Sequence, residues 1–503
     1  MKPGGAGGGG GKNYGSAISQ GISEFDRMGH ALDEAERNID KDVEHTIAGL
    51  PKKLSETTTL KRKSIEATES GVEMTTASAA PAESSYVLFP FVVAGLGMVF
   101  AGIVLSIVVT WPLFVQVPEI LILVPALLGL KGNLEMTLAS RLSTLANLGH
   151  MDSSKQRKDV VIANLALVQV QATVVAFLAS AFAASLAWIS NGDFDWAHGA
   201  LMCASSLATA CSASLVLSLL MVIVIVASRH YNINPDNVAT PIAASLGDLT
   251  TLSVLAFFGS VFLKAHETES WLNTIVVLAF LLVLPIWARI AQNNEQTNET
   301  LRNGWTPVIM SMLISSGGGF ILENAVKSYQ SLSTFGPVLN GVGGNLAAVQ
   351  ASRLSTFFHQ SAAALGELPE GWTIDRFLSV KRAFFSKEWD SRSARVLLLL
   401  VVPGHICFNF LIQIFSLHDH DGVRPPHGPL FNSLYLLAAI VQVMILLFVC
   451  QYLVALLWKL KVNPDNSVIP YLTALGDLLG TFLLFIVFLL TDKFEPKEIS
   501  EAK

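Results

Sequence analysis

The sequence predicts an all-α polytopic membrane protein with about 11 transmembrane helices, arranged as two parallel five-helix repeats and one connecting helix. The chain has 503 residues and only 14% of them are charged, so it is too apolar for an ordinary soluble protein. Apolar stretches long enough to cross about 30 Å of hydrocarbon as helices dominate positions 86–491. Two long motifs also occur twice in the same order, which indicates two similar halves.

The apolar runs give the order of the predicted spans. They cover residues 86–111, 118–147, 160–190, 197–227, 238–263, 271–290, 304–325, 333–358, 395–416, 430–458 and 467–491. Five spans would leave the second half starting on the opposite side of the membrane, and a sixth span restores the original side. We therefore expect parallel repeats at 86–263 and 304–491, joined by a connecting helix and linker at 264–303.

Both ends of the chain are polar. Residues 1–85 begin with a glycine tract and contain many charged and hydroxyl side chains, so we expect a disordered cytosolic tail. Residues 492–503 form a short C-terminal tail. With the N-terminus inside, the inner loops carry fourteen Lys and Arg residues and the outer loops three, so we expect a cytosolic N-terminus and an extracellular C-terminus. The sequon at Asn298 then lies inside and stays unglycosylated.

The duplicated motifs place one carboxylate in each half. Residues 234–248 match 463–477 at an offset of 229, and both copies end in Leu-Gly-Asp, at Asp248 and Asp477. An ionised carboxylate inside an apolar span is costly, so it normally faces a cavity, a partner or an ion pathway. The alternative is a protonated carboxyl that only serves packing. The preceding Gly247 and Gly476 leave room for a neighbouring helix or an ion.

The charge of this pair suggests its ligand. Two like carboxylates that face each other across an axis repel, and a divalent cation between them removes that conflict. Hard oxygen ligands favour magnesium or calcium over zinc or copper. Two carboxylates are too few for a dehydrated calcium site and suit Mg²⁺ that keeps most of its water. Manganese and other hard divalent ions remain alternatives.

A second duplicated motif contributes amide side chains. Residues 125–144 match 337–356 at an offset of 212, and each copy contains Gly-Asn. We expect Gly132-Asn133 and Gly344-Asn345 to mark a broken or tightly packed helix, with both asparagines as pore-lining metal ligands. The alternative is a packing hinge. Glu135 has Ala347 as its counterpart, so it is present in the first half only.

Further residues are candidates for lining or supporting the pore. They are Gly132, Gly344, Glu135, Gly247, Gly476, Thr251, Thr481, Gln169 and His405. Gln169 and His405 occupy matching positions in the third spans, where an interior histidine with a satisfied hydrogen bond is the competing interpretation. We rate the histidine- and aspartate-rich outer segment at 418–427 as a solvated loop, and no basic block indicates nucleic acid.

These motifs resemble a known family. The sequence K-G-N-L-E-M-T-L-A-S-R-L-S-T at 131–144, the 234–248 motif, G-V-G-G-N-L at 341–346 and P-Y-L-T-A-L-G-D-L-L-G-T at 470–481 are similar to the solute carrier 41 family. Its animal members are magnesium transporters, distantly related to bacterial MgtE channels. The resemblance covers about 86–491 and implies an MgtE-like fold. The bacterial homodimer would be replaced by two halves of one chain, which allows a monomer.

The resemblance also implies roles and a location. Asp248 and Asp477 would hold hydrated Mg²⁺ on the axis, near Asn133 and Asn345. Sodium-dependent Mg²⁺ efflux, with Na⁺ as coupling ion, is expected, and the plasma membrane is the expected host, with the mitochondrial inner membrane as alternative. The cytosolic magnesium- and nucleotide-sensing domains of the bacterial relatives have no counterpart in the sequence, so that mode of regulation is in doubt. We expect Mg²⁺ as substrate and no resident cofactor.

Two alternatives remain at this stage. A magnesium channel needs no second ion, and the sequence does not distinguish it from an exchanger. An intramembrane aspartyl protease also uses two buried aspartates. Its expected signature is an asymmetric Gly-x-Gly-Asp, whereas both copies here read x-Leu-Gly-Asp. We therefore expect a transporter and not an enzyme.

Overall fold

The computed structural model describes residues 81–130, 134–147, 151, 153–192, 195–230, 236–269, 271–361, 365–368, 372–416, 425–464, 467–496 and 499. All regular structure within these ranges is helical. Most of the predicted N-terminal tail, residues 1–80, lies outside them. The outer histidine and aspartate residues at 418–421 lie outside them as well.

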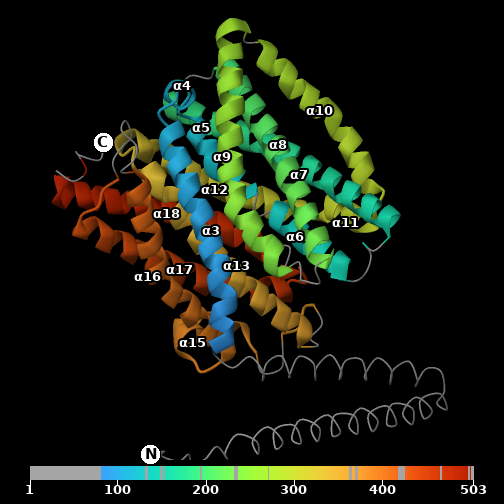
Figure 1. Cartoon of the computed structure of the whole chain (residues 1–503), viewed down its shortest axis with the longest axis vertical. Helices are drawn as coiled ribbons and strands as arrows, with labels where there is room; N and C mark the ends of the chain where they lie inside the picture. Colours follow the sequence, from blue (N-terminus) through green and yellow to red (C-terminus); the bar gives the residue numbers. More distant parts are fainter. Residues whose placement is uncertain are drawn as a thin grey trace, which may run out of the picture. The chain divides into compact units, whose positions relative to one another are not determined.

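The helices are the following, in chain order (Figure 1). They are α3 Pro81–Val108, α4 Pro112–Gln116, α5 Ile120–Leu130, α6 Met136–Asn147, α7 Ser154–Asn191, α8 Trp196–His230, α9 Asp236–Glu269, α10 Trp271–Gln292, α11 Glu295–Asn303, α12 Trp305–Ser328, α13 Leu332–Gln360, α14 Ile374–Phe377, α15 Val380–Phe385, α16 Trp389–Ser416, α17 Pro429–Lys459 and α18 Val468–Phe494. We call α3–α9 the first half and α12–α18 the second half.

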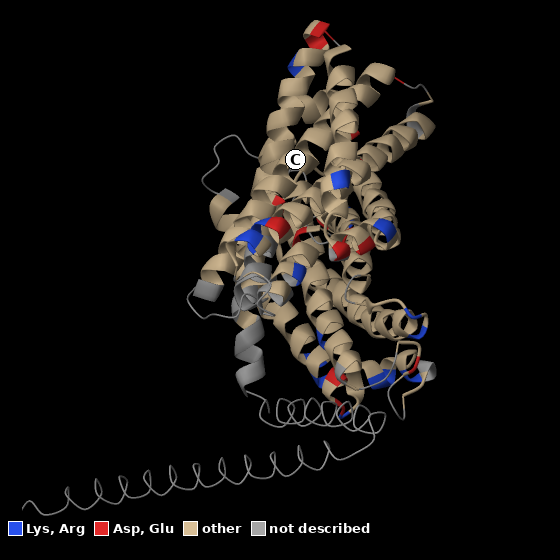
Figure 2. Ribbon diagram, turned by 90° about the vertical axis from the view of Figure 1, so that its right-hand side faces the viewer, with Lys and Arg blue, Asp and Glu red and all other residues tan. Residues whose placement is uncertain are grey.

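Nine helices in the described part of the chain are long and apolar enough to cross a membrane, so this is a multi-pass membrane protein. They are α3, α7, α8, α9, α10, α12, α16, α17 and α18. Figure 2 shows that most of their length carries neither acidic nor basic residues. The other two predicted spans, 118–147 and 333–358, lie in α5–α6 and α13. Helix α5 is too short to qualify, and α13 contains several polar residues.

The connecting helix α10 lies at the edge of the bundle. It packs against α7 and α8, and only 6% of its apolar window is buried within the protein. A helix that is apolar all round and exposed in the isolated chain is suited to contact with lipid. In the sequence this helix lies between α9 of the first half and α12 of the second.

The helix contacts of the two halves are reciprocal. Within the halves, α3 packs on α9 and α12 packs on α18. Between them, α3 contacts α13 and α12 contacts α5, while α16 packs on α3 and α7 on α12. In Figure 1, α16 and α17 lie on one side of α3 while α8 and α10 lie on the other. Reciprocal contacts of this kind are typical of an interface around a two-fold axis.

Two glycines at matching positions allow close backbone contacts between the halves. A Cβ atom added at Gly102 would overlap the carbonyl oxygen of Thr334, and one added at Gly319 would overlap that of Ile122. Ile122 and Thr334 are related by the offset of 212 found in the sequence. The two glycines therefore occupy equivalent positions in α3 and α12, and corresponding positions of these two helices are 217 residues apart. Only glycine allows a neighbouring backbone to come this close.

A second pair of contacts supports the same register. Gly129 faces the hydroxyl of Ser315, with a distance of 3.2 Å from an added Cβ to Oγ. Its counterpart Gly341 packs against the thioether of Met98. Ser315 and Met98 are again 217 residues apart. Corresponding positions of the two halves therefore make corresponding contacts, although their side chains differ.

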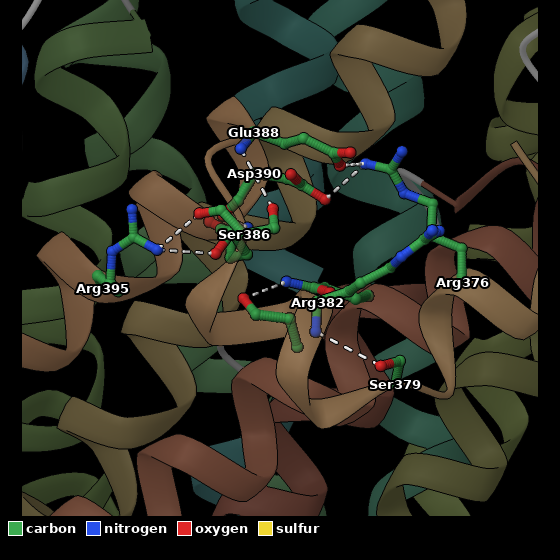
Figure 3. Close-up of polar contacts among 11 residues, drawn as sticks. Arg376, Ser379, Arg382, Ser386, Glu388, Asp390 and Arg395 are labelled. Atoms are coloured by element: carbon green, nitrogen blue, oxygen red, sulfur yellow. Dashed lines mark hydrogen bonds and ion pairs between the residues drawn. The ribbon is translucent and has the colours of Figure 1, made fainter. Parts of the chain in front are cut away.

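The long loop after α13 packs against the ends of α13, α16 and α17. Arg376 forms an ion pair with Glu388 and a second one with Asp390 at 3.3 Å, and its guanidinium lies 3.6 Å from the ring centre of Trp372. Arg395 donates to the carbonyl oxygens of Phe384 and Ser386 (Figure 3). The described part of this loop is therefore an ordered cap, and the first half has only a short connection at the same place.

Candidate functional site

One cavity lies where the first, second and fifth helices of both halves meet. Its volume is about 50 Å³. It is lined by Leu105, Val124, Pro125, Leu128, Gly129, Met136, Asp248, Leu322, Gly336, Pro337, Asn340, Gly341, Gly344, Asn345, Thr473 and Asp477. These residues come from α3, α5, α6, α9, α12, α13 and α18. Asp248 and Asp477 thus border the same space, although they are 229 residues apart.

Most lining residues occur together with their counterpart from the other half. The pairs are Leu105 with Leu322, Val124 with Gly336, Pro125 with Pro337, Leu128 with Asn340, Gly129 with Gly341, and Asp248 with Asp477. The offsets are 217 for the first pair, 212 for the next four and 229 for the last. A cavity lined in this way is bordered by equivalent parts of both halves.

The proline and glycine of each motif position the aspartate. In α18, Pro470 is the third residue of the helix, where its missing N–H has no helical partner to lose. Asp477 follows seven residues later, about 10 Å further along the axis. Its Oδ2 accepts a hydrogen bond of 2.9 Å from Ser315 Oγ. Asp248 is 4% exposed. Asp477 therefore lies about two and a half turns inside α18, and Asp248 lies more than three turns inside α9.

Only the second of the two Gly-Asn segments lies within the described residues. In the second half, α13 continues without a break through Gly344 and Asn345, and both residues line the cavity. An added Cβ at Gly344 would lie 3.4 Å from the backbone of Thr473, so this helix is tightly packed on α18. In the first half, α5 ends at Leu130 and α6 begins at Met136. Gly132 and Asn133 lie outside the described residues.

The residues that flank the aspartates are buried but do not border the cavity. The carbonyl oxygen of Gly476 accepts a hydrogen bond of 2.9 Å from Gln442 Nε2. The hydroxyl of Thr481 accepts one of 2.9 Å from Asn340 Nδ2. Gly247 and Thr251 are buried next to Asp248. These residues support the helices that present the carboxylates.

Three predicted residues are not among those that line the cavity. Gln169 donates to the carbonyl of Cys211 at 3.1 Å. His405 is fully buried, with Nδ1 3.0 Å from the hydroxyl of Tyr435 and Nε2 without a hydrogen-bond partner. Glu135 is buried immediately before Met136, which does line the cavity. None of the three borders the space between the aspartates.

The structure adds residues that the sequence did not single out. Asn340 lines the cavity, Ser315 contacts Asp477, and Gln442 contacts Gly476. A signal existed for Asn340, because it interrupts an apolar run in which its counterpart is Leu128. Ser315 gives no such signal, because its counterpart Met98 can be identified only once the corresponding positions of α3 and α12 are known. No group of three His, Cys, Asp or Glu placed to hold a metal occurs among the described residues.

Comparison with known proteins gives the family. The model of the MgtE family, described as divalent cation transporters, matches residues 124–258 and 336–487, which together are more than half of the chain. This chain belongs to the MgtE divalent cation transporter family. The two matched segments lie in the first and second halves, and each contains one of the two aspartates.

Curated relatives agree with this membership. Solute carrier family 41 member 3 of Rattus norvegicus is 47% identical over 80% of this chain and 86% of its own length. Member 2 of Homo sapiens is 48% identical over 81% of this chain and 71% of its own length. Member 2 of Xenopus laevis is 48% identical over 80% and 71%. No solved structure matches this MgtE-family chain.

Family membership decides between a transporter and an enzyme, the two classes of protein considered from the sequence. The chain is a transporter of the solute carrier 41 type and not an enzyme. The intramembrane aspartyl protease, considered because of its two buried aspartates, is therefore dismissed. The remaining question is how this MgtE-family transporter uses the cavity that both aspartates border.

Proposed function

We propose that this protein transports Mg²⁺ through the cavity between its two halves, with Asp248 and Asp477 binding the ion. The observation that carries the proposal is that both carboxylates line one cavity, together with matched residues of both halves. Two negative charges at one place repel each other, and a single divalent cation neutralises them. Asn133 and Asn345 are the proposed amide ligands to the water shell of that ion.

The proposed pore lies at the interface of two parallel repeats, which act as a pseudo-dimer within one chain. Support comes from the reciprocal helix contacts, from the matched glycine contacts and from the two segments matched by one family model. A monomer is then sufficient for transport. The connecting helix α10 restores the orientation that parallel repeats require.

The size of the cavity favours transport with a conformational change. A space of about 50 Å³ holds only a few water molecules. Mg²⁺ gives up its water reluctantly, so a hydrated ion needs the halves to move apart on one side at a time. We propose that this movement is coupled to Na⁺ in the opposite direction, which makes the protein a sodium-dependent exchanger in the plasma membrane.

The orientation in the membrane follows from the charged loops. We propose a cytosolic N-terminus and an extracellular C-terminus, because far more Lys and Arg residues lie in the loops that this orientation places inside. In this orientation the cap formed by the loop after α13 is on the cytosolic side.

Magnesium flux into proteoliposomes tests the binding residues. Asp248→Asn and Asp477→Asn, like the alanine variants, should reduce flux to the background of empty vesicles, because each removes one of the two charges. Asp492→Asn is a matched control: it lies on the same helix as Asp477, but its carboxylate accepts from Tyr329 and does not line the cavity. Normal flux in both site variants would refute the assignment.

The same vesicles separate exchange from conduction. Flux should require an opposing Na⁺ gradient if Na⁺ is the coupling ion. Mg²⁺ flux that is unchanged when Na⁺ is replaced on both sides would exclude sodium coupling and identify a channel, while leaving the role of the aspartates intact.

A further inference from the structure

The two halves differ at three corresponding positions around the aspartates, and one of these positions, Leu128 and Asn340, lines the cavity. In the first half these positions hold Met98, Leu128 and Leu252. In the second half, at the offsets of 217, 212 and 229, they hold Ser315, Asn340 and Thr481. All three apolar residues of one half are thus replaced by hydrogen-bonding residues in the other. Asp248 and Asp477 have the same sequence context but different surroundings.

The three polar residues form two buried hydrogen bonds. Ser315 is 1% exposed and donates to Asp477 Oδ2 at 2.9 Å. Thr481 is fully buried and accepts from Asn340 Nδ2 at 2.9 Å. Ser315 thus fixes the carboxylate of Asp477, and Thr481 fixes the amide of Asn340. In the first half, Met98 and Leu252 offer no hydrogen-bonding group at the matching places.

The carbonyl oxygen of Asn340 has no hydrogen-bond donor. The side chain is only 9% exposed, its Oδ1 is buried without a partner, and the residue lines the same cavity as Asp477. Gly480 makes room for this oxygen, because an added Cβ at that position would overlap it. The counterpart of Gly480 in the first half is Thr251. A buried amide oxygen without a donor lowers stability, and because Asn340 lines the cavity, a water molecule or a cation in the cavity can supply the missing interaction.

The chemistry of these groups selects the ligand. The single negative charge of Asp477 balances a monovalent cation, and the carbonyl oxygen of Asn340 adds a neutral ligand. A divalent cation needs the second carboxylate, Asp248, for its charge to be balanced. Carbonyl oxygens can replace part of the water shell of a monovalent ion, and hard oxygen donors suit alkali cations. Mg²⁺ keeps most of its water and gains less from such a direct ligand.

We propose that Asp477 and Asn340 form a monovalent-cation subsite on the second-half wall of the cavity, without an equivalent on the first-half wall. Ser315 and Thr481 are its positioning residues. This inference rests on the proposed function, because it assigns the coupling ion a place in the same cavity. Both ions then use Asp477, so a bound Na⁺ and a fully bound Mg²⁺ exclude each other.

Equilibrium binding of radioactive sodium to the purified full-length protein tests the subsite. The informative variant is Asn340→Leu/Thr481→Leu, which reproduces the residues of the first half and leaves no unpaired hydroxyl. It should weaken Na⁺ binding by about tenfold or more, the effect expected when a ligand to a charge is lost. Asp477→Asn should weaken Na⁺ binding at least as much, whereas Asp248→Asn, which removes a charge of the same cavity but no ligand to Na⁺, should weaken it clearly less. Asn324→Leu, an exposed asparagine of the same half, is the matched control.

Displacement of bound Na⁺ by Mg²⁺ distinguishes this inference from the proposed function. Mg²⁺ should compete in the unmodified protein and lose most of its effect in Asp248→Asn. Equal loss of Na⁺ binding in Asp248→Asn and Asp477→Asn, or unchanged Na⁺ binding in the double leucine variant, would overturn the subsite. Undiminished Mg²⁺ competition in Asp248→Asn would instead contradict the shared divalent site. Melting temperatures of all variants confirm that they are folded.

Discussion

At the scale of single residues, the space beside Asp477 depends on a glycine of the opposite half. Gly129 lies next to the hydrogen bond between Ser315 and Asp477. An added Cβ would be 3.7 Å from Asp477 Oδ2 and 3.2 Å from Ser315 Oγ. The first distance is an ordinary contact and the second is tight, so alanine should fit with a small shift. It would, however, occupy space that the water shell of an ion needs.

Gly129→Ala should therefore reduce Mg²⁺ flux several-fold while the protein remains folded. The reason is that a methyl group replaces water beside the carboxylate, and an ion that keeps its water shell has less room. Flux in proteoliposomes and the melting temperature in detergent measure the two effects. Gly317→Ala serves as the control, because its added Cβ meets only the side chain of Leu478 at 3.6 Å and Gly317 does not line the cavity. Full transport by Gly129→Ala would show that this space is not part of the path.

At the scale of helices, the halves are held together where α3 crosses α13 and where α12 crosses α5. Gly102 and Gly319 allow these crossings, each against a carbonyl oxygen of the other half. A methyl group at either site must push two helix backbones apart, because the atom that it meets belongs to the backbone and not to a flexible side chain. Overpacking of this kind costs about 1–3 kcal/mol. Because the two contacts are equivalent, the two costs should be similar.

Gly102→Ala and Gly319→Ala should lower the melting temperature in detergent by similar amounts, and Gly317→Ala on the same helix as Gly319 should leave it nearly unchanged. Thermal unfolding followed by loss of the monodisperse peak measures this. A large effect at one glycine and none at the other would mean that the two crossings are not equivalent.

Much of this architecture was predictable from the sequence, because long apolar runs and constant motif offsets can be recognised without knowing which helices are in contact. Nine of the eleven predicted spans match described helices that are long and apolar enough to cross a membrane, and the structure places both aspartates on one cavity. The register of α3 against α12 did not follow, since the residues around Gly102 and Gly319 differ. The roles of Ser315 and Thr481 depend on contacts across helices, which no local pattern encodes.

At the scale of the whole molecule, the proposed parallel repeats predict where the ends of the chain lie. An odd number of crossings would place the two termini on opposite sides, and the distribution of Lys and Arg favours a cytosolic N-terminus. An epitope at the C-terminus should accordingly be accessible to antibody on intact cells, and one at the N-terminus only after permeabilisation. Asn298 should carry no glycan. Staining of both epitopes on the same side would contradict the parallel repeats.

The central claim is that one magnesium ion is held between the two carboxylates. Density maps of the protein with Mg²⁺ and with a chelator test it most directly. We predict Mg²⁺-dependent density between Asp248 and Asp477, reached through water and absent with the chelator and in Asp477→Asn. Carboxylates that point apart into separate helix contacts, with identical maps under both conditions, would contradict the account.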